Sequence, residues 1–87
     1  MITVYIPPLL RSLTAGAEQV QTTGTNVRQI IDNLDEQFPG LRSRLCDGDT
    51  LRPGLTVAVN GTVSSLGLLQ KVPDGSEVHF LPAVGGG

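Results

Sequence analysis

The residues with the clearest chemical potential stand together at positions 80–87, which read FLPAVGGG. Gly85, Gly86 and Gly87 lack a Cβ atom, so this stretch can enter a channel too narrow for side chains. Residues 83–87 reach about 15–18 Å when extended. A carboxylate on Gly87 could attack the α-phosphate of ATP to form an acyl-adenylate, from which a sulfur nucleophile would displace AMP. The catalytic groups, ATP and Mg²⁺ would then belong to a partner enzyme.

The remainder of the chain offers little for catalysis of its own. There is no Ser/His/Asp set at a plausible spacing, and the sole histidine, His79, falls in a predicted strand. Metal ligands do not cluster, and no glycine loop precedes a helix to hold phosphate. Cys46 could accept sulfur or form a thioester with an activating enzyme, although a small, semi-buried loop residue is the commoner role. We therefore expect no enzyme activity and no bound cofactor, with activation supplied by a partner.

Composition limits the partners and the setting. The 87 residues suffice for one domain, and 39% of them are apolar. A net charge of −2 argues against a nucleic-acid partner, which would require a basic patch. No apolar run approaches the roughly 20 residues that cross a bilayer, and no basic segment precedes MITVYIPPLL, so neither a membrane contact nor a signal peptide is expected. A single cysteine favours a reducing, cytoplasmic location.

Four stretches have the pattern of strands. Ile2, Val4 and Ile6 alternate with polar or amphipathic residues, and residues 18–22 alternate more weakly after a hairpin through residues 15–16. Residues 55–61 (LTVAVNG) form a third strand that ends in the favoured Asn-Gly turn, and residues 76–82 (SEVHFLP) form the last one after an Asp-Gly turn. Residues 46–54 are predicted to be a loop.

One amphipathic helix lies between the two strand pairs. Its apolar stripe consists of Val27, Ile30, Ile31, Leu34 and Phe38. Asn26 is the expected N-cap, with Gln29 reaching back as in a capping box. Pro39-Gly40 ends the helix, and Leu41 and Leu45 extend the apolar face through a short second turn.

This order of elements predicts an α+β fold of the β-grasp (ubiquitin-like) type, a mixed sheet of about four strands packed on one main helix. The first and last strands would be parallel neighbours, so residues 1–82 form the body and residues 83–87 a tail that leaves a central strand. The alternation turns Tyr5, Ala58, His79 and Leu81 toward the open face of the sheet. Either this face binds a partner, with Leu81 beside the tail, or its apolar residues are singly exposed without consequence.

The chain resembles the ubiquitin-like sulfur carriers of the MoaD/ThiS family. The resemblance covers essentially the whole chain and rests on the element order, VAVNG at 57–61, VPDGSEVHFLPAVGGG at 72–87 and the closing glycine pair. It implies that an E1-like enzyme adenylates Gly87 and converts it to a thiocarboxylate, with Gly85 and Gly86 threading into that enzyme. Leu81, Pro82, Val84 and Tyr5 would then contact the partner.

The resemblance also bears on the recipient of the sulfur. Residues 6–16, IPPLLRSLTAG, resemble carriers that feed cysteine biosynthesis, the CysO type, and lack the Phe-Ala-x-Leu-Arg-Glu pattern of many molybdopterin synthase small subunits. A sulfur-accepting cysteine synthase is therefore the expected second partner, and the molybdopterin synthase large subunit is the alternative. Two further hypotheses are a modifier joined to lysines of other proteins and an interaction module with an inert tail.

Overall fold

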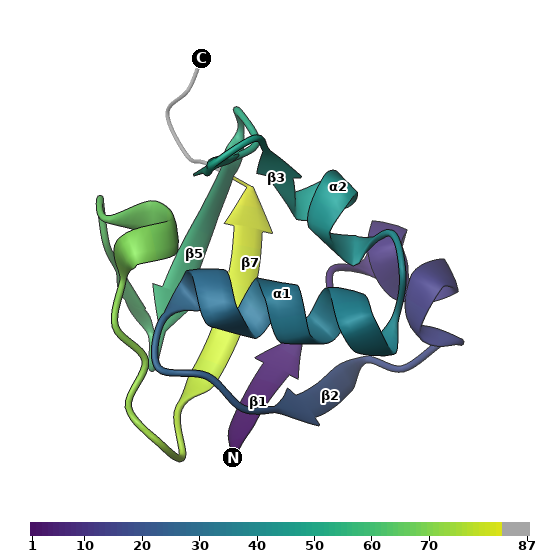
Figure 1. Ribbon diagram of the computed structural model, residues 1–87, viewed down its shortest axis with the longest axis horizontal. Helices are drawn as coiled ribbons and strands as arrows, with labels where there is room; N and C mark the ends of the chain where they lie inside the picture. The colour runs from purple at the N-terminus through teal and green to yellow at the C-terminus, as the bar shows by residue number, and fades with distance from the viewer. Residues whose placement is uncertain (83–87) are drawn as a thin grey trace.

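The computed structural model describes residues 1–82 and has a five-stranded sheet with helices on one face (Figure 1). The order across the sheet is β2, β1, β7, β5, β6. The strands comprise β1 (Ile2–Tyr5), β2 (Gln19–Thr22), β5 (Leu55–Val59), β6 (Thr62–Val63) and β7 (Glu77–Pro82). The helices are α1 (Val27–Gln37) and α2 (Leu41–Leu45), with two 3₁₀ helices, η1 (Pro8–Thr14) and η2 (Gly67–Leu69).

The strand pairing confirms the predicted α+β architecture. β1 runs parallel to β7, with Val4 opposite Val78, whereas β2 and β5 are antiparallel to β1 and β7. β7 is therefore the central strand, as the β-grasp prediction requires. Asn60 and Gly61 both have positive φ angles, 52° and 82°, which is the type I′ geometry expected of an Asn-Gly hairpin turn.

Helix α1 forms where the sequence predicts it, and its start is fixed by side-chain hydrogen bonds. The Asn26 side chain accepts a hydrogen bond from the Gln29 backbone N–H at 2.8 Å. Gln29 also reaches back, but its Oε1 accepts from the N–H and hydroxyl of Thr25 rather than from the backbone of Asn26. The predicted capping box is therefore correct for Asn26 and displaced by one residue for Gln29.

The core lies between α1 and the covered face of the sheet. Its fully buried members from the sheet are Ile2, Val4, Val57 and Val78, and those from the helices are Val27, Ile30, Ile31, Leu34 and Leu41. All of these are aliphatic, as a chain with few aromatic residues requires. Within residues 1–82, no helix has the length and apolar character needed to span a membrane.

Three details differ from the sequence prediction. The sheet has five strands rather than about four, because the Asn60-Gly61 turn is followed by the two-residue strand β6. The connection between β1 and β2 contains η1 and is not a simple hairpin. Residues 46–54 are not all loop: β3 (Cys46–Asp47) and β4 (Thr50–Leu51) form a separate small sheet around a turn at Gly48. Two-residue strands are too short to show an alternating pattern.

Candidate functional site

The candidate site begins where β7 leaves the sheet. The pairing of β1 with β7 ends at Tyr5 and His79, whereas β5 accompanies β7 as far as Leu55 opposite Pro82. β1 cannot continue because Pro7 follows it and has no backbone N–H to donate. The last three residues of β7 thus have a neighbouring strand on one side only. We call this region, comprising Phe80–Pro82 with Leu55 and Thr56 of β5, the exit end of the sheet.

The predicted partner-binding residues separate into two groups. Leu81, which is 38% exposed, and Pro82, also exposed, lie at the exit end itself. Tyr5 lies one strand away, opposite His79. Val84, Gly85, Gly86 and Gly87 fall outside the described residues. The structure therefore brings Tyr5, Leu81 and Pro82 onto one part of the sheet and leaves the glycine positions as predictions.

A row of side chains crosses the open face of all five strands. Cα pairing aligns its members, which we call the open-face row: Gln19 of β2, Tyr5 of β1, His79 of β7, Ala58 of β5 and Val63 of β6. The rings of Tyr5 and His79 stack in parallel, with centroids 4.1 Å apart and planes inclined by 6°. His79 faces the open side as predicted and is half-buried in this stack. Ala58 faces outward as predicted, yet it is only 3% exposed, because larger neighbours flank its methyl group.

The row combines predicted and unpredicted residues. Gln19 and Val63 were not singled out in the sequence, because their membership depends on the pairing register of two edge strands. Val63 is exposed, and Leu81 lies beside the row, opposite Thr56. The resulting surface has an aromatic centre and apolar neighbours. Its five members include no Asp, Glu, Lys or Arg, which suits docking of a partly apolar partner surface.

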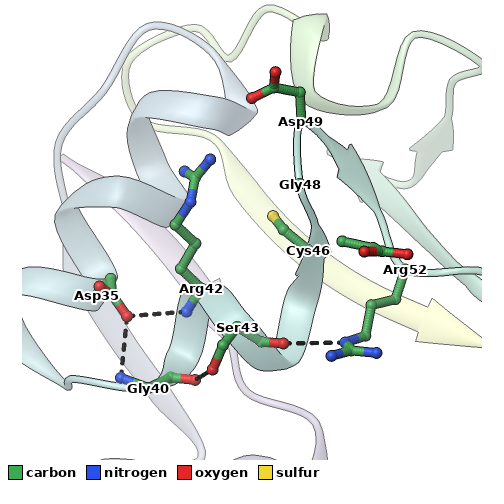
Figure 2. Close-up of a pocket in the computed structure, with 9 residues that line it drawn as sticks. Asp35, Gly40, Arg42, Ser43, Cys46, Gly48, Asp49 and Arg52 are labelled. Carbon is green, nitrogen blue, oxygen red and sulfur yellow. Dashed lines mark hydrogen bonds between the residues drawn. The ribbon is translucent and has the colours of Figure 1, made fainter.

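A pocket of about 580 Å³ lies beside α2 and β3 (Figure 2). Asp35 Oδ1 accepts hydrogen bonds from the backbone N–H groups of Gly40 and Arg42, both at 3.0 Å, and so holds the start of α2. Arg52 Nε donates to the Ser43 carbonyl at 3.0 Å. These contacts tie the pocket wall together, because two of its charged side chains are hydrogen-bonded to its own backbone.

Cys46 lines this pocket but is poorly placed to react. It is only 5% exposed, which makes it more deeply buried than the semi-buried loop residue expected from the sequence. Burial raises the pKa of its thiol, an effect that nearby Arg42 partly opposes. Since the thiolate is the nucleophilic form, burial and the raised pKa both suppress its reactivity. The position therefore favours a packing role over sulfur acceptance.

The end of the sheet opposite the exit is closed by hydrogen bonds. The Met1 ammonium group forms an ion pair with Asp74, and this contact lowers the pKa of the Asp74 carboxyl. Asn60 accepts from the Glu77 N–H at 2.9 Å and donates to the Ser76 hydroxyl at 3.1 Å. We call this region the starting end of the sheet, since β1 and β7 both begin there. In the part of the chain that the structure describes, no cluster of three or more His, Cys, Asp or Glu residues could hold a metal ion.

A β-grasp domain whose central strand is followed in the sequence by a glycine-rich segment is typical of ubiquitin-like proteins. The family model described as the ThiS family matches residues 4–87, and the chain belongs to that family.

Three relatives illustrate the similarity. The chain is 34% identical to the sulfur carrier protein CysO of Mycobacterium tuberculosis, over 99% of this chain and 98% of the relative. The crystal structure of that CysO matches with a TM-score of 0.88 and 32% identity, covering 97% of this chain and all of the other. The Amycolatopsis orientalis BexX/CysO complex contains a chain that matches with a TM-score of 0.90 and 37% identity, with full coverage of both.

A third, more distant match is SAMP1, small archaeal modifier protein 1, of Haloferax volcanii. Its crystal structure matches with a TM-score of 0.71 and 27% identity, covering 99% of this chain and 98% of the other. The predicted fold and the predicted family are both confirmed by these matches.

Proposed function

We propose that this protein is a sulfur carrier that bears the transferable sulfur on Gly87. The observation that carries the proposal is the near full-length identity of 34% to a protein named as a sulfur carrier. The fold adds support, because β7 is the central strand and continues past the end of β1, so that Pro82 lies at the exit end of the sheet. Support also comes from the residues themselves, since three successive glycines present no side chain beside the carbonyl that reacts.

The proposed chemistry has two steps, both performed by an E1-like partner that binds ATP and Mg²⁺. In the first, a carboxylate oxygen of Gly87 attacks the α-phosphorus of ATP, pyrophosphate leaves, and an acyl-adenylate forms. In the second, a sulfur nucleophile attacks the acyl carbon, the bond from carbon to the phosphate oxygen breaks, and AMP leaves. With sulfide as the nucleophile, a C–S bond forms, the sulfur proton goes to solvent, and the product is a thiocarboxylate on Gly87. The protein itself acts as a co-substrate and binds no cofactor.

Within this proposal the named residues have distinct roles. Gly85 and Gly86 pass through the narrow entrance of the partner's active site. Leu81, Pro82 and Val84 contact the rim of that entrance, and Tyr5 anchors the partner on the open-face row. Since the ring of Tyr5 stacks on His79, its position is already fixed before docking, which reduces the entropy lost on binding.

The proposed recipient is a sulfur-accepting synthase of cysteine biosynthesis, in the cytoplasm. The similarity to the CysO of Mycobacterium tuberculosis and to a chain of the BexX/CysO complex favours this recipient over the molybdopterin synthase large subunit, which remains the alternative acceptor. A pull-down of the native protein should recover an E1-like enzyme and a cysteine synthase. Recovery of a molybdopterin synthase large subunit instead would support the alternative.

The decisive test is the intact mass of the protein purified from its native cells. We expect a fraction of the molecules to carry one sulfur in place of one oxygen, located on Gly87 by fragmentation. Gly87→Trp, or one alanine added after Gly87, should abolish this species while leaving the fold unchanged. Leu9→Trp is the matched control, because Leu9 is 90% exposed on η1 and lies outside the residues assigned to the exit end and to partner binding. Sulfur on a chain extended beyond Gly87 would show that a free Gly87 carboxylate is not required.

A second candidate function is covalent modification of other proteins. The match to SAMP1, a protein named as a modifier, favours this candidate. It shares the adenylation step and differs in the acceptor, a lysine amine in place of sulfur. Immunoblots and peptide mapping of cell extracts should then reveal Gly87 joined through an isopeptide bond to lysines of other proteins, and the absence of such adducts would exclude it.

A further inference from the structure

The nucleophilic side chains of this protein are unevenly distributed with respect to the exit end. Of the six Lys and Arg residues in the sequence, Lys71 is the one lysine. The five arginines carry guanidinium groups that stay protonated at neutral pH and do not act as nucleophiles. The primary amines of residues 1–87 are therefore the Met1 ammonium group and the side chain of Lys71.

The Met1 amine belongs to the starting end of the sheet, and Lys71 lies in the connection from η2 to β7 that leads to this end. Met1 precedes β1 and is held by Asp74, and the Gly75 N–H donates to the Met1 carbonyl at 3.0 Å. Lys71 lies three residues before Asp74 and forms an isolated bridge with Asn26, four residues after the end of β2. Figure 1 shows that β7 begins at this end and runs away from it.

The length of β7 separates the Met1 amine from the exit. The six residues Glu77–Pro82, at about 3.3 Å per residue, cover about 17 Å between the first and last Cα atoms. Residues 83–87 span at most about 18 Å. The Gly87 carbonyl would have to run back along the full strand in its most extended form to approach the Met1 amine, so its effective concentration there is low.

The exit end presents different chemistry. The basic residue nearest to the start of β5 in the sequence is Arg52. Its carbonyl accepts a hydrogen bond from the N–H of Leu55, which pairs with Pro82. The single thiol, Cys46, follows Leu45, whose carbonyl accepts from the N–H of Arg52, but Cys46 is only 5% exposed. Among residues 1–82, the groups around the exit are thus hydroxyls, a guanidinium, an imidazole and a shielded thiol.

We infer that the surface around the exit end is kept free of accessible amines and thiols, so that an activated Gly87 carbonyl is captured by a partner's nucleophile and not by its own chain. This inference rests on the proposed function, since it concerns the activated form of Gly87. The side reaction avoided is aminolysis. An amine nitrogen attacks the acyl carbon, a C–N bond forms, the bond to AMP or to a thiol breaks, and the amine proton goes to the leaving group or to solvent.

The test places an amine at either end of the same face. Thr56 and Thr3 are both half-buried, point to the open face, and lie opposite Leu81 and Glu77 respectively. Thr56→Lys therefore puts an amine at the exit end, and Thr3→Lys is its matched control at the starting end. Each protein is prepared as a C-terminal thioester of Gly87 by intein cleavage with a small thiol, so no activating partner is needed.

Intact mass then follows conversion of the thioester at mildly alkaline pH, and peptide mapping locates any internal amide. We expect the Thr56→Lys protein to form an internal amide at least about tenfold faster than the Thr3→Lys and unsubstituted proteins. Leu81→Lys serves as a second exit-end variant if Thr56→Lys does not fold. Equal rates for the two threonine variants, or equally rapid capture by Lys71 or Met1 in the unsubstituted chain, would overturn the inference.

The result of the thioester experiment does not depend on whether the proposed function is correct. A native protein without sulfur on Gly87 would refute the carrier proposal and leave the thioester result unchanged. Equal amide formation at both ends would refute the amine-placement inference while leaving the carrier proposal intact.

Discussion

The two faces of the sheet are built from alternate residues of the same strands and have opposite character. On the face covered by α1, Val4, Val57 and Val78 are completely buried against the helix. On the open face, Tyr5 and His79 stack on each other without a covering element among the described residues. Because successive residues of a strand point to opposite faces of the sheet, one residue stabilises the core while the next is available to contact a partner. Substitutions at adjacent positions should therefore have effects of different kinds.

The largest expected effect comes from the covered face. Leu34→Ala removes a fully buried side chain of α1 and leaves a cavity against the sheet, which should reduce the free energy of unfolding by about 2–5 kcal/mol. Urea unfolding followed by circular dichroism measures this loss. Leu9→Ala is the control with the same chemical change, and because Leu9 is exposed it should alter stability by about 0.5 kcal/mol or less. Similar losses in both variants would contradict the assignment of the core.

A smaller effect is expected where the chain passes from β2 to α1. A Cβ atom at Gly24 would lie 2.8 Å from Ile30 Cγ1 and 3.1 Å from the Ile30 backbone nitrogen. Ile30 is buried against the sheet and cannot move aside, so Gly24→Ala should cost about 1–3 kcal/mol in the free energy of unfolding.

Gly48→Ala is the control that shows how much of the destabilisation comes from the clash and how much from a side chain at a positive φ angle. Gly48 also has a positive φ, 65°, but a Cβ atom there would meet nothing within 4 Å. Thermal unfolding of the two variants should show a larger decrease in Tm for Gly24→Ala. A larger decrease for Gly48→Ala would mean that Gly24 does not determine how α1 is seated on the sheet.

The covered face was predictable from sequence because its signals are local and repeated. The apolar residues from Val27 to Leu34 recur with the period of a helix, and Ile2 and Val4 recur with the period of a strand. Both patterns can be recognised without knowing which elements pack against them. The small sheet at Cys46–Leu51 was missed because each of its strands has two residues. Its formation depends on packing beside α2 and not on any pattern in its own sequence.

The open face was predicted only in part because its arrangement depends on register. Tyr5, His79 and Leu81 could be assigned to it by alternation alone. The stacking of Tyr5 on His79 required that β1 and β7 be parallel and aligned at those residues, and the inclusion of Gln19 and Val63 required the alignment of two edge strands. Such long-range pairing is encoded jointly by several strands, so no single stretch reveals it.

Tyr5→Ala should have a small effect on stability and a large effect on partner binding. Tyr5 and His79 are both half-buried and stack on the open face, so we expect Tyr5→Ala to reduce the free energy of unfolding by about 0.5–1.5 kcal/mol. Affinity for the activating partner should fall by about tenfold or more, as expected when an aromatic anchor is removed from an interface. Thr3→Ala, on the same face but at the starting end, should leave that affinity unchanged. Calorimetric titration with the partner measures both, and an unaltered affinity for Tyr5→Ala would remove the open-face row from the interface.

The smallest effect is expected at a contact that belongs to neither face. Asp74 pairs with the Met1 ammonium group in full exposure, and this hydrogen bond and charge lower the pKa of its carboxyl in the folded protein. A carboxyl with a lowered folded pKa stabilises the fold above its unfolded pKa, about 3.9, and loses that contribution as the pH falls through the folded value. Urea unfolding should therefore show Asp74→Asn to be slightly less stable than the unsubstituted protein near neutral pH. The difference should shrink as the pH falls below about 4, and a difference that grew with acidification would mean that the ion pair does not stabilise the starting end.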